Sequence, residues 1–295
     1  MRYFLTAFFI LLGCYLIVNL VGFLEAHKLC ISHAVLRPSK TSKNDISRFV
    51  KQKGSYAKNV DPSSLSNTKN TKILFISDLH AEFCFIPAAK VIDTIRKANV
   101  DAVVFGGDIC NDPLKHEVGT SYLFEIKKAC DELHIPFLGT TGNHDVHLTK
   151  EEVLKSGFTD LRDGPVKVRD IIFSGVNDTG KKDRVWGDVS DIDNEGLTHV
   201  LISHNPDWLL DAASKSMLGN VDHMISGHIH GGQICLPFRL EIMVIRKDVL
   251  PRKRVINGVF DGAGVTFFIG RGIGCVLVPF RLFARPEITI VEFEK

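Results

Sequence analysis

The sequence predicts an α/β fold built from layers with mixed sheets, preceded by a helix that crosses a membrane. Two observations carry this prediction. Residues 3–24 hold no charged residue and no histidine, and after residue 72 short apolar runs alternate with segments of helical spacing. Short buried strands that alternate with helices are typical of layered α/β folds. We therefore expect a membrane anchor over 1–27, a basic juxtamembrane linker over 28–71 and a folded domain over 72–295.

The composition allows a packed core and excludes some classes of protein. The chain has 295 residues, of which 45% are apolar, enough for one large domain or two small ones. Its net charge of +2 is too small to indicate a nucleic-acid partner. The seven cysteines are odd in number and form no CxxC pair, which argues against a disulfide framework or a zinc knuckle and favours a reducing compartment.

The apolar N-terminal segment from Tyr3 to Leu24 has 22 residues. As a helix it would be roughly 33 Å long, enough to span the hydrocarbon core of a bilayer. A cleaved signal peptide would have a shorter apolar region, about 7–15 residues, and a small-residue cleavage site. The stretch LLGC at 11–14 resembles a lipoprotein cleavage site, which leaves a second alternative. We predict an uncleaved single-pass anchor.

Basic residues after the apolar segment predict its orientation. Arg2 alone precedes the segment, whereas Lys28, Arg37, Lys40 and Lys43 follow it. Lys and Arg concentrate on the cytoplasmic side of membrane helices, so the domain is expected at the cytoplasmic face of the inner membrane. The basic segment up to Lys72 is expected to be a solvated linker, or a segment drawn to anionic lipid headgroups, with 28–36 its one candidate strand.

In the folded domain, polar side chains follow successive predicted strands. Helical spacing falls at 86–100 and 120–133, and further strands are expected at IIFSGV, VTFFIG and EITIVEF. The polar residues that end five of the strands are Asp78 and His80 after KILFIS, Asp108 after AVVFGG, Asn143 and His144 after IPFLGTTG, His204 after THVLIS, and His228 and His230 after HMISG. Loops that follow strands in such folds converge on one edge of the sheet, where ligands bind.

The residue types at these strand ends predict metal binding. A single histidine after a strand is more often structural, but five successive polar strand ends are difficult to explain in that way. Carboxylates, a carboxamide and imidazoles together suit manganese, iron or zinc better than calcium. Two such cations about 3.5–4 Å apart can clamp a phosphoryl group. Because ligand imidazoles must be neutral, activity should fall in acid.

These five blocks, in this order, resemble the calcineurin-like metallophosphoesterase superfamily. The stretches GHIHGGQ (227–233), SHNPD (203–207) and RPEIT (285–289) are similar to its membrane-associated bacterial branch, which includes the chlamydial-type UDP-2,3-diacylglucosamine pyrophosphatases of lipid A synthesis. The resemblance implies a four-layer α/β sandwich with two mixed sheets. It also implies two divalent cations, manganese first and iron or zinc as alternatives.

The resemblance implies a role for each residue of the blocks. The implied ligands are Asp78, His80 and His230 for one metal, Asn143, His204 and His228 for the other, and Asp108 for both. His144 would stabilise charge on the phosphate or protonate the leaving oxygen. Asp145 would orient His144 through a hydrogen bond.

Two stretches around these blocks are candidates for substrate binding. The long polar loop 175–196, which contains Trp186, is either a lid over the site or a disordered segment. The stretch 236–260 mixes large apolar residues with arginine and lysine. It is either a strand–loop–strand connection with a solvated face or a membrane-surface element that admits an acylated substrate. Candidate substrate contacts are Trp186, Arg239, Arg246 and Arg271, with Arg281 as a further phosphate contact.

The expected function is a membrane-anchored dimetal phosphohydrolase that cleaves a lipid-linked phosphoester or pyrophosphate. The resemblance favours UDP-2,3-diacylglucosamine, cleaved to UMP and 2,3-diacylglucosamine 1-phosphate. The expected partners are a membrane lipid or lipid-linked substrate and an anionic membrane surface, with no nucleic acid. Two alternatives remain: a broad-specificity phosphodiesterase or phospholipid phosphatase, and a non-catalytic membrane scaffold. The presence of every implied ligand and of His144 disfavours the scaffold.

Overall fold

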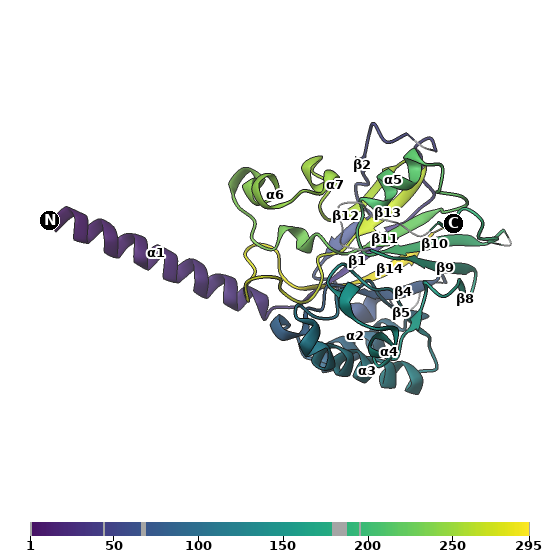
Figure 1. Ribbon diagram of the computed structural model, residues 1–295, viewed down its shortest axis with the longest axis horizontal. Coiled ribbons are helices and arrows are strands. Elements are labelled where there is room, and N and C mark those ends of the chain that lie inside the picture. The colour runs from purple at the N-terminus through teal and green to yellow at the C-terminus, as the bar shows by residue number, and fades with distance from the viewer. Residues whose placement is uncertain (1, 44, 66–68, 179–187, 195, 295) are drawn as a thin grey trace.

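The computed structural model describes residues 2–43, 45–65, 69–178, 188–194 and 196–294. Two seven-stranded sheets lie face to face, and helices cover their outer faces (Figure 1). Both sheets mix parallel and antiparallel pairs, so the predicted α/β fold with two mixed sheets is confirmed. The helices are α1 Arg2–Ala26, α2 Ala88–Ala98, α3 His116–Glu132, α4 Lys150–Leu154, α5 Trp208–Ser214, α6 Leu240–Ile245 and α7 Val249–Arg252.

The first sheet has the strand order β3-β1-β14-β4-β5-β6-β7. Its strands are β1 Cys30–Leu36, β3 Tyr56–Lys58, β4 Lys72–Ile76, β5 Ala102–Phe105, β6 Phe137–Gly139, β7 Thr159–Asp160 and β14 Glu287–Phe293. Strands β4, β5 and β6 are parallel, with Ile76 opposite Phe105 and Phe105 opposite Gly139. This register brings their carboxyl ends to one edge.

The second sheet has the order β2-β12-β13-β11-β10-β9-β8. Its strands are β2 Val50–Lys51, β8 Val166–Val168, β9 Ile171–Val176, β10 Thr198–Ser203, β11 His223–Ser226, β12 Gly258–Gly262 and β13 Val265–Ile269. Strands β9, β10, β11 and β13 run parallel, so β10 and β11 also end at a common edge.

Three apolar clusters hold the layers together. Between the sheets, Phe75 and Val104 of the first pack in one cluster with Ile202 of the second. On the outer face of the first sheet, Val91 of α2 and Leu123 of α3 belong to the cluster that includes Phe105. On the outer face of the second sheet, Trp208 and Leu209 of α5 pack in a third cluster with Phe267 of β13. Burial of each large apolar side chain contributes about 1.5–3 kcal/mol, so these interfaces fix the stacking of helix, sheet, sheet and helix.

The structure corrects the prediction of a linker over 28–71. The candidate strand at 28–36 forms as β1, and it pairs in parallel with β14 from Cys30 opposite Glu287 to Leu36 opposite Phe293. β3 pairs with β1, and β2 joins the second sheet. Cys30 and Leu36 are buried, whereas most of the basic residues of this segment lie exposed at the rim. The basic composition therefore reflects the edge of the domain rather than a separate linker.

Helix α1 extends away from the domain (Figure 1) and is long and apolar enough to cross a membrane by length and composition, a test that a signal sequence also passes. Its last turns contact the domain. The backbone N–H of Arg281 donates to the carbonyl of Gly22 at 3.1 Å, and the ring of His27 stacks on Phe85 at 4.3 Å. A Cβ at position 22 would lie 2.6 Å from Cδ2 of Phe280, so glycine permits this close approach.

The stretch 236–260 does not form the strand–loop–strand connection considered above. Two short helices, α6 and α7, precede a single strand, β12. The predicted lid over 175–196 lies partly outside the described residues, which leave out 179–187 and 195, and its first two residues belong to β9.

Candidate metal centre

The seven predicted ligands lie in loops at one edge of the two sheets. Asp78 and Asp108 follow β4 and β5, while His204 and His228 follow β10 and β11. Because the strands of each set are parallel, their ends converge at this edge, as expected for a ligand site in an α/β fold.

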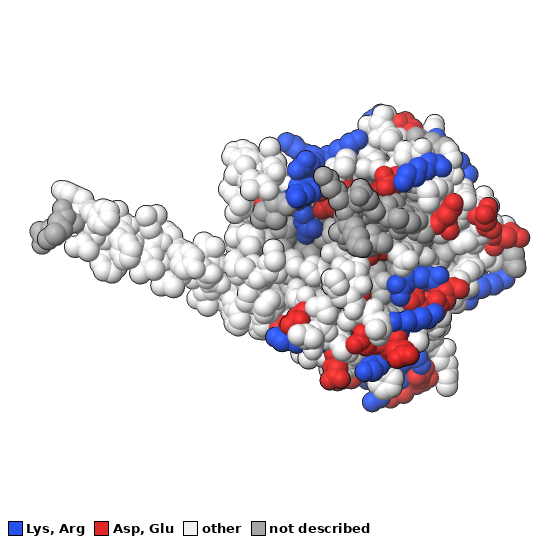
Figure 2. Space-filling model, in the orientation of Figure 1, with Lys and Arg blue, Asp and Glu red and all other residues white. Residues whose placement is uncertain are grey.

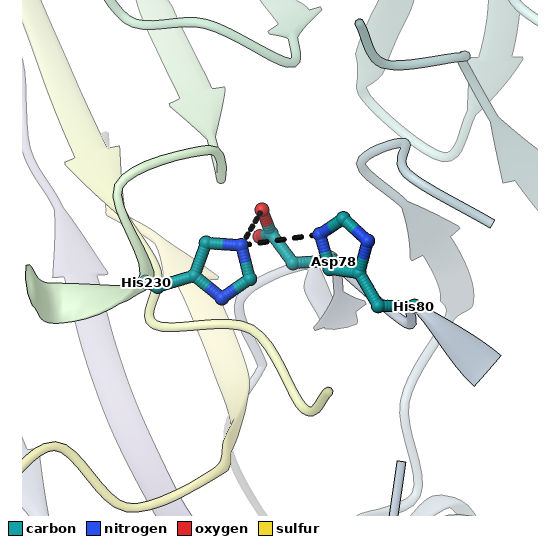
Figure 3. A group of neighbouring side chains, drawn as sticks. All are labelled: Asp78, His80 and His230. Atoms are coloured by element: carbon teal, nitrogen blue, oxygen red, sulfur yellow. Dashed lines mark hydrogen bonds and ion pairs between the residues drawn. The ribbon is translucent and has the colours of Figure 1, made fainter. Parts of the chain in front are cut away.

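Asp78, His80 and His230 form the first group of converging side chains (Figure 3). The Nε2 atom of His230 lies 3.2 Å from Oδ1 of Asp78 and 3.2 Å from Nε2 of His80. All three side chains are buried. Burial lowers the pKa of His80 to about 4 and the pKa of His230 well below its ordinary value. Both imidazoles are therefore neutral near pH 7, the form that binds a cation.

Asp108, His204 and His228 form the second group. Oδ2 of Asp108 lies 3.1 Å from Nε2 of His204 and 3.4 Å from Nε2 of His80 in the first group. Nδ1 of His204 lies 2.7 Å from the carbonyl of Gly106, to which it donates, and this turns Nε2 toward Asp108. Asp108 thus stands between the groups, where a ligand shared by two ions would be.

Buried polar atoms at this edge fit cations. Among the described residues, Oδ1 of Asn143 is buried without a hydrogen-bond partner, and Nε2 of His204 is buried against the carboxylate of Asp108. Buried polar atoms almost always have a partner, so Oδ1 of Asn143 is free to bind an ion. Although burial opposes the charge, Asp108 raises the pKa of His204 to about 10. A proton and a cation would therefore compete for Nε2 of His204, and two divalent cations would supply Lewis-acid polarisation of a phosphate.

Left-handed backbone conformations mark five of the predicted ligands. Their φ angles are 52° for Asp78, 39° for His80, 63° for Asp108, 69° for His228 and 55° for His230. Residues other than glycine rarely adopt this region, and clusters of such residues occur at functional sites. The sequence gives little signal of this strain beyond the neighbouring glycines. At Gly107, with φ of 97°, a Cβ would lie 2.5 Å from the backbone nitrogen of Gly142.

Asp145 does not play the predicted role of orienting His144. Its carboxylate accepts hydrogen bonds at 2.8 Å from the backbone N–H groups of Asp108, Ile109 and Gly142. These donors belong to the loops after β5 and β6. Beyond the ends of these strands the backbone N–H groups have no partner in the sheet and need another acceptor. Burial and the charge of Asp108 raise the pKa of Asp145, while the backbone donors oppose that shift. Asp145 therefore fastens together the two loops that carry predicted ligands.

His144 is half-buried beside both groups. It forms a third cluster of possible ligands with His80 and Asp108, and its ring centroid lies 4.8 Å from that of His80. Its backbone N–H donates to Oδ1 of Asp108 at 2.9 Å. His144 also lines the pocket that opens over the centre, so its imidazole can reach a bound phosphate.

A pocket of about 520 Å³ opens over the metal centre. The polar part of its lining includes Asp108, Asn143, His144, His228 and His230. Five apolar side chains also line it, and we call them the apolar wall: Ile234, Ile242, Val276, Leu277 and Val278. Such a pocket fits an amphiphilic ligand, with its phosphate at the polar part of the lining.

Of the predicted substrate contacts that fall among the described residues, one lines this pocket. Arg246 lines it, and its Nη2 donates to the carbonyl of Ile229 at 3.2 Å. Arg239 instead pairs with Glu241 at 3.2 Å, and Nε of Arg271 lies 3.7 Å from Glu287. Neither lines the pocket. Trp186 lies outside the described residues.

Arg281 has a structural role in place of the predicted phosphate contact. Its side chain is fully buried and donates to backbone carbonyls, including that of Ala284 at 3.0 Å. Nη2 also lies 3.1 Å from Nδ1 of His230. The arginine therefore holds a predicted ligand from behind.

Sequence reasoning missed Asp248, which lines the pocket. Its Oδ1 lies 3.4 Å from Nε2 of His228, and His228 and Arg246 lower its pKa against the effect of burial. It stands 18 residues past the last predicted ligand and follows no strand, so no motif marks it.

Comparisons with known proteins identify the class. The sequence profile of the calcineurin-like phosphoesterase family matches residues 71–232, more than half of the chain. The chain therefore belongs to the calcineurin-like phosphoesterase family. The match covers the strand ends from Asp78 to His230. Together with the two ligand groups, it makes the protein a metal-dependent phosphoester hydrolase with candidate ligands for two metals, which goes against a non-catalytic scaffold.

The chain is also similar to particular proteins of known sequence or structure. The chain is 29% identical to the uncharacterized metallophosphoesterase YkuE of Bacillus subtilis, over 80% of this chain and 87% of that protein. It is 27% identical to the phosphodiesterase YaeI of Escherichia coli, over 77% and 83%. A crystal structure of a dimetal phosphatase from Danio rerio aligns with a TM-score of 0.44 and 12% identity, over 76% of this chain and 99% of that one.

Proposed function

We propose that this protein is a membrane-anchored dimetal phosphohydrolase that cleaves a lipid-linked phosphoester or pyrophosphate. The observation that carries the proposal is the mixed lining of the pocket, in which predicted metal ligands and five apolar side chains share one cavity. A water-soluble phosphate ester would not require the apolar side chains. The proposed partners are therefore a lipid-linked substrate and an anionic membrane surface.

The first candidate substrate is UDP-2,3-diacylglucosamine, cleaved to UMP and 2,3-diacylglucosamine 1-phosphate. The sequence resemblance to the membrane-associated branch supports this choice, and the apolar wall suits its acyl chains. The proposed ions are manganese, with iron or zinc as alternatives, because the donor set mixes carboxylate, amide and imidazole.

The side chains around the pocket can divide the work of hydrolysis. Asp78, His80 and His230 would hold one cation, Asn143, His204 and His228 the other, and Asp108 both. The cations would polarise the phosphate and supply a nucleophile from water. His144 can donate a proton to the leaving oxygen, the role of a general acid. Arg246 and Lys247 line the pocket and can neutralise a second phosphate.

Helix α1 is the proposed anchor, with the domain at the cytoplasmic face of the inner membrane. The excess of Lys and Arg after the helix supports this orientation. An intact mass that retains residues 1–27, together with resistance to extraction from membranes at alkaline pH, would support the anchor. A mature chain that begins after the helix would instead show a cleaved signal sequence.

A broad-specificity phosphodiesterase is the second candidate, since a relative at 27% identity is named a phosphodiesterase. The test is release of UMP from UDP-2,3-diacylglucosamine by the detergent-purified protein with manganese, and with EDTA as the control. Bis-p-nitrophenyl phosphate is assayed in parallel. Release of UMP that EDTA abolishes supports the lipid substrate, whereas hydrolysis of the soluble diester alone supports the second candidate.

A matched pair of variants tests whether the measured activity depends on His144. His144→Asn should lower the rate about 10²–10⁴-fold, the usual contribution of a general acid. His147→Asn changes an exposed histidine three residues away and should leave the rate unchanged. Equal rates in the two variants would show that His144 has no part in the reaction.

A further inference from the structure

Exposed apolar side chains gather on two segments beside the pocket. The members are Leu236, Phe238, Leu240, Met243 and Val244 on segment 236–245, and Leu277 and Phe283 on loop 276–285. Phe238 is 92% exposed, Val244 81% and Leu277 80%. Scattered exposed apolar residues are ordinary, but a gathering of this size marks a surface that contacts something apolar. We call these seven residues the apolar collar.

Hydrogen bonds join the two segments of the apolar collar. Nε2 of Gln233 donates to the carbonyl of Val276 at 2.8 Å, and the N–H of Cys235 donates to the carbonyl of Leu282 at 2.9 Å. Because Gln233 and Cys235 lead directly into segment 236–245, the two segments form one surface.

The collar is also joined to the end of α1. The N–H of Phe283 donates to Oε2 of Glu25 at 2.5 Å, and Arg285 lies 3.7 Å from the same carboxylate group. Helix α6 lies at the end of the domain from which α1 extends (Figure 1). A bilayer crossed by α1 would therefore meet the collar where the helix enters the domain.

Basic residues flank the collar. Lys247, Arg252, Lys253 and Arg254 are exposed just after α6. Figure 2 shows a largely uncharged surface running from α1 to α6, with Lys and Arg gathered next to the α6 region on the side away from α1. Apolar side chains that enter the acyl region, with cations at the level of the headgroups, are typical of surfaces that bind anionic bilayers.

We propose that the apolar collar enters the interface of an anionic lipid bilayer, so that the pocket of the metal centre opens toward the lipid phase. Leu277 belongs both to the collar and to the apolar wall of the pocket. An acyl chain could thus pass from the bilayer along this wall while its phosphate meets the metal ligands. This inference rests on the proposed function, which supplies the anchor and a lipid-linked substrate.

Membrane contact can be measured without any activity. The full chain is reconstituted into vesicles of phosphatidylethanolamine and phosphatidylglycerol, with or without brominated acyl chains that quench tryptophan. Leu240→Trp adds a reporter to the collar at a position that is 45% exposed. Leu133→Trp is the matched control at a position that is 39% exposed, four residues before β6 and so at the opposite end of the sheet from the metal centre.

We expect the emission added by Leu240→Trp to be quenched several-fold more strongly than that added by Leu133→Trp. Equal quenching would overturn the proposal, even if the protein hydrolyses the lipid substrate. A second pair, Val244→Asp and Leu133→Asp, is assayed on vesicle-borne lipid substrate and on bis-p-nitrophenyl phosphate.

Val244→Asp should slow hydrolysis of the lipid substrate at least several-fold and leave the soluble diester unaffected, while Leu133→Asp changes neither. An equal loss on both substrates would contradict a role in lipid access. If the tryptophan added by Leu240→Trp is quenched but no lipid phosphate is cleaved, the result supports membrane contact by the collar and overturns the proposed lipid-linked substrate.

Discussion

Oδ1 of Asp248 lies 3.4 Å from Nε2 of His228, and the amide of Asn205 lies 3.4 Å from the same oxygen. Asp248 directly precedes α7, whose first N–H groups are held by Asp207 at 2.6 and 2.9 Å. A carboxylate fixed in this way against one ring nitrogen of an imidazole sets the orientation of the ring and raises its basicity. Asp248 is therefore a positioning residue for His228.

Replacing Asp248 by Asn should weaken metal binding. Loss of such a supporting carboxylate costs about 10–100-fold in metal affinity, and we expect a loss of that size for Asp248→Asn. Titration of the apoprotein with manganese, followed by electron paramagnetic resonance of the free ion, measures it directly. Asp211→Asn, at a half-exposed position on α5, is the control. Equal affinities in the two variants would remove Asp248 from the metal centre.

Replacing Asp108 by Asn should abolish turnover in a folded protein. Asp108 stands between both ligand groups, so its loss should weaken both predicted metal sites and lower the rate by more than about 100-fold. The fold should persist, because Asn has nearly the same shape and His204 can lose its proton. Metal content per chain tests the loss of metal binding, and circular dichroism tests whether the fold persists. Asp163→Asn, at an exposed position, is the control. A variant that binds two ions would exclude Asp108 as the shared ligand.

Asp145→Asn should destabilise the metal-free protein. An amide cannot accept from three N–H groups with two oxygens as the carboxylate does, so at least one buried donor loses its partner. The expected loss is about 1–3 kcal/mol in the free energy of unfolding. Urea denaturation in EDTA measures it. If Asp145→Asn changed only the rate and left stability intact, Asp145 would act on the reaction, as first predicted, and not on the loops.

The predicted metal ligands were accessible from the sequence because each follows a short apolar run. Asp78 after β4 and Asp108 after β5 show this directly, since a buried parallel strand is apolar along its whole length. The position of β1 was not accessible in the same way. Its partner β14 lies about 250 residues further along the chain, and no local pattern specifies so distant a pairing.

Other features depend on tertiary contacts that a sequence pattern does not express. Asp248 reaches His228 through the turn between α6 and α7, and neither short helix was predicted. Arg281 is buried because backbone carbonyls from several loops converge on it, so its charge alone suggested the wrong role.

Stability should fall in acid partly through His223, which lies in β11 away from the predicted ligands. Burial lowers the pKa of His223 from 6.5 to about 4. Between these values the unfolded chain binds a proton that the folded chain does not, so the free energy of unfolding falls as the pH is lowered from about 6.5 to about 4. A shift of this size corresponds to about 3 kcal/mol.

His223→Phe removes this titration while keeping a ring in the buried site, where the imidazole lies 5.9 Å from the ring of Phe293. The test is urea denaturation of the metal-free protein at about pH 4.5, inside the pH range over which His223 lowers stability, and at about pH 7, above that range. The variant should lose less stability in acid than the parent. His147→Phe, at an exposed position, should behave like the parent. Parallel pH profiles in His223→Phe and the parent would mean that His223 is not the group that resists protonation, and that other buried groups cause the acid sensitivity.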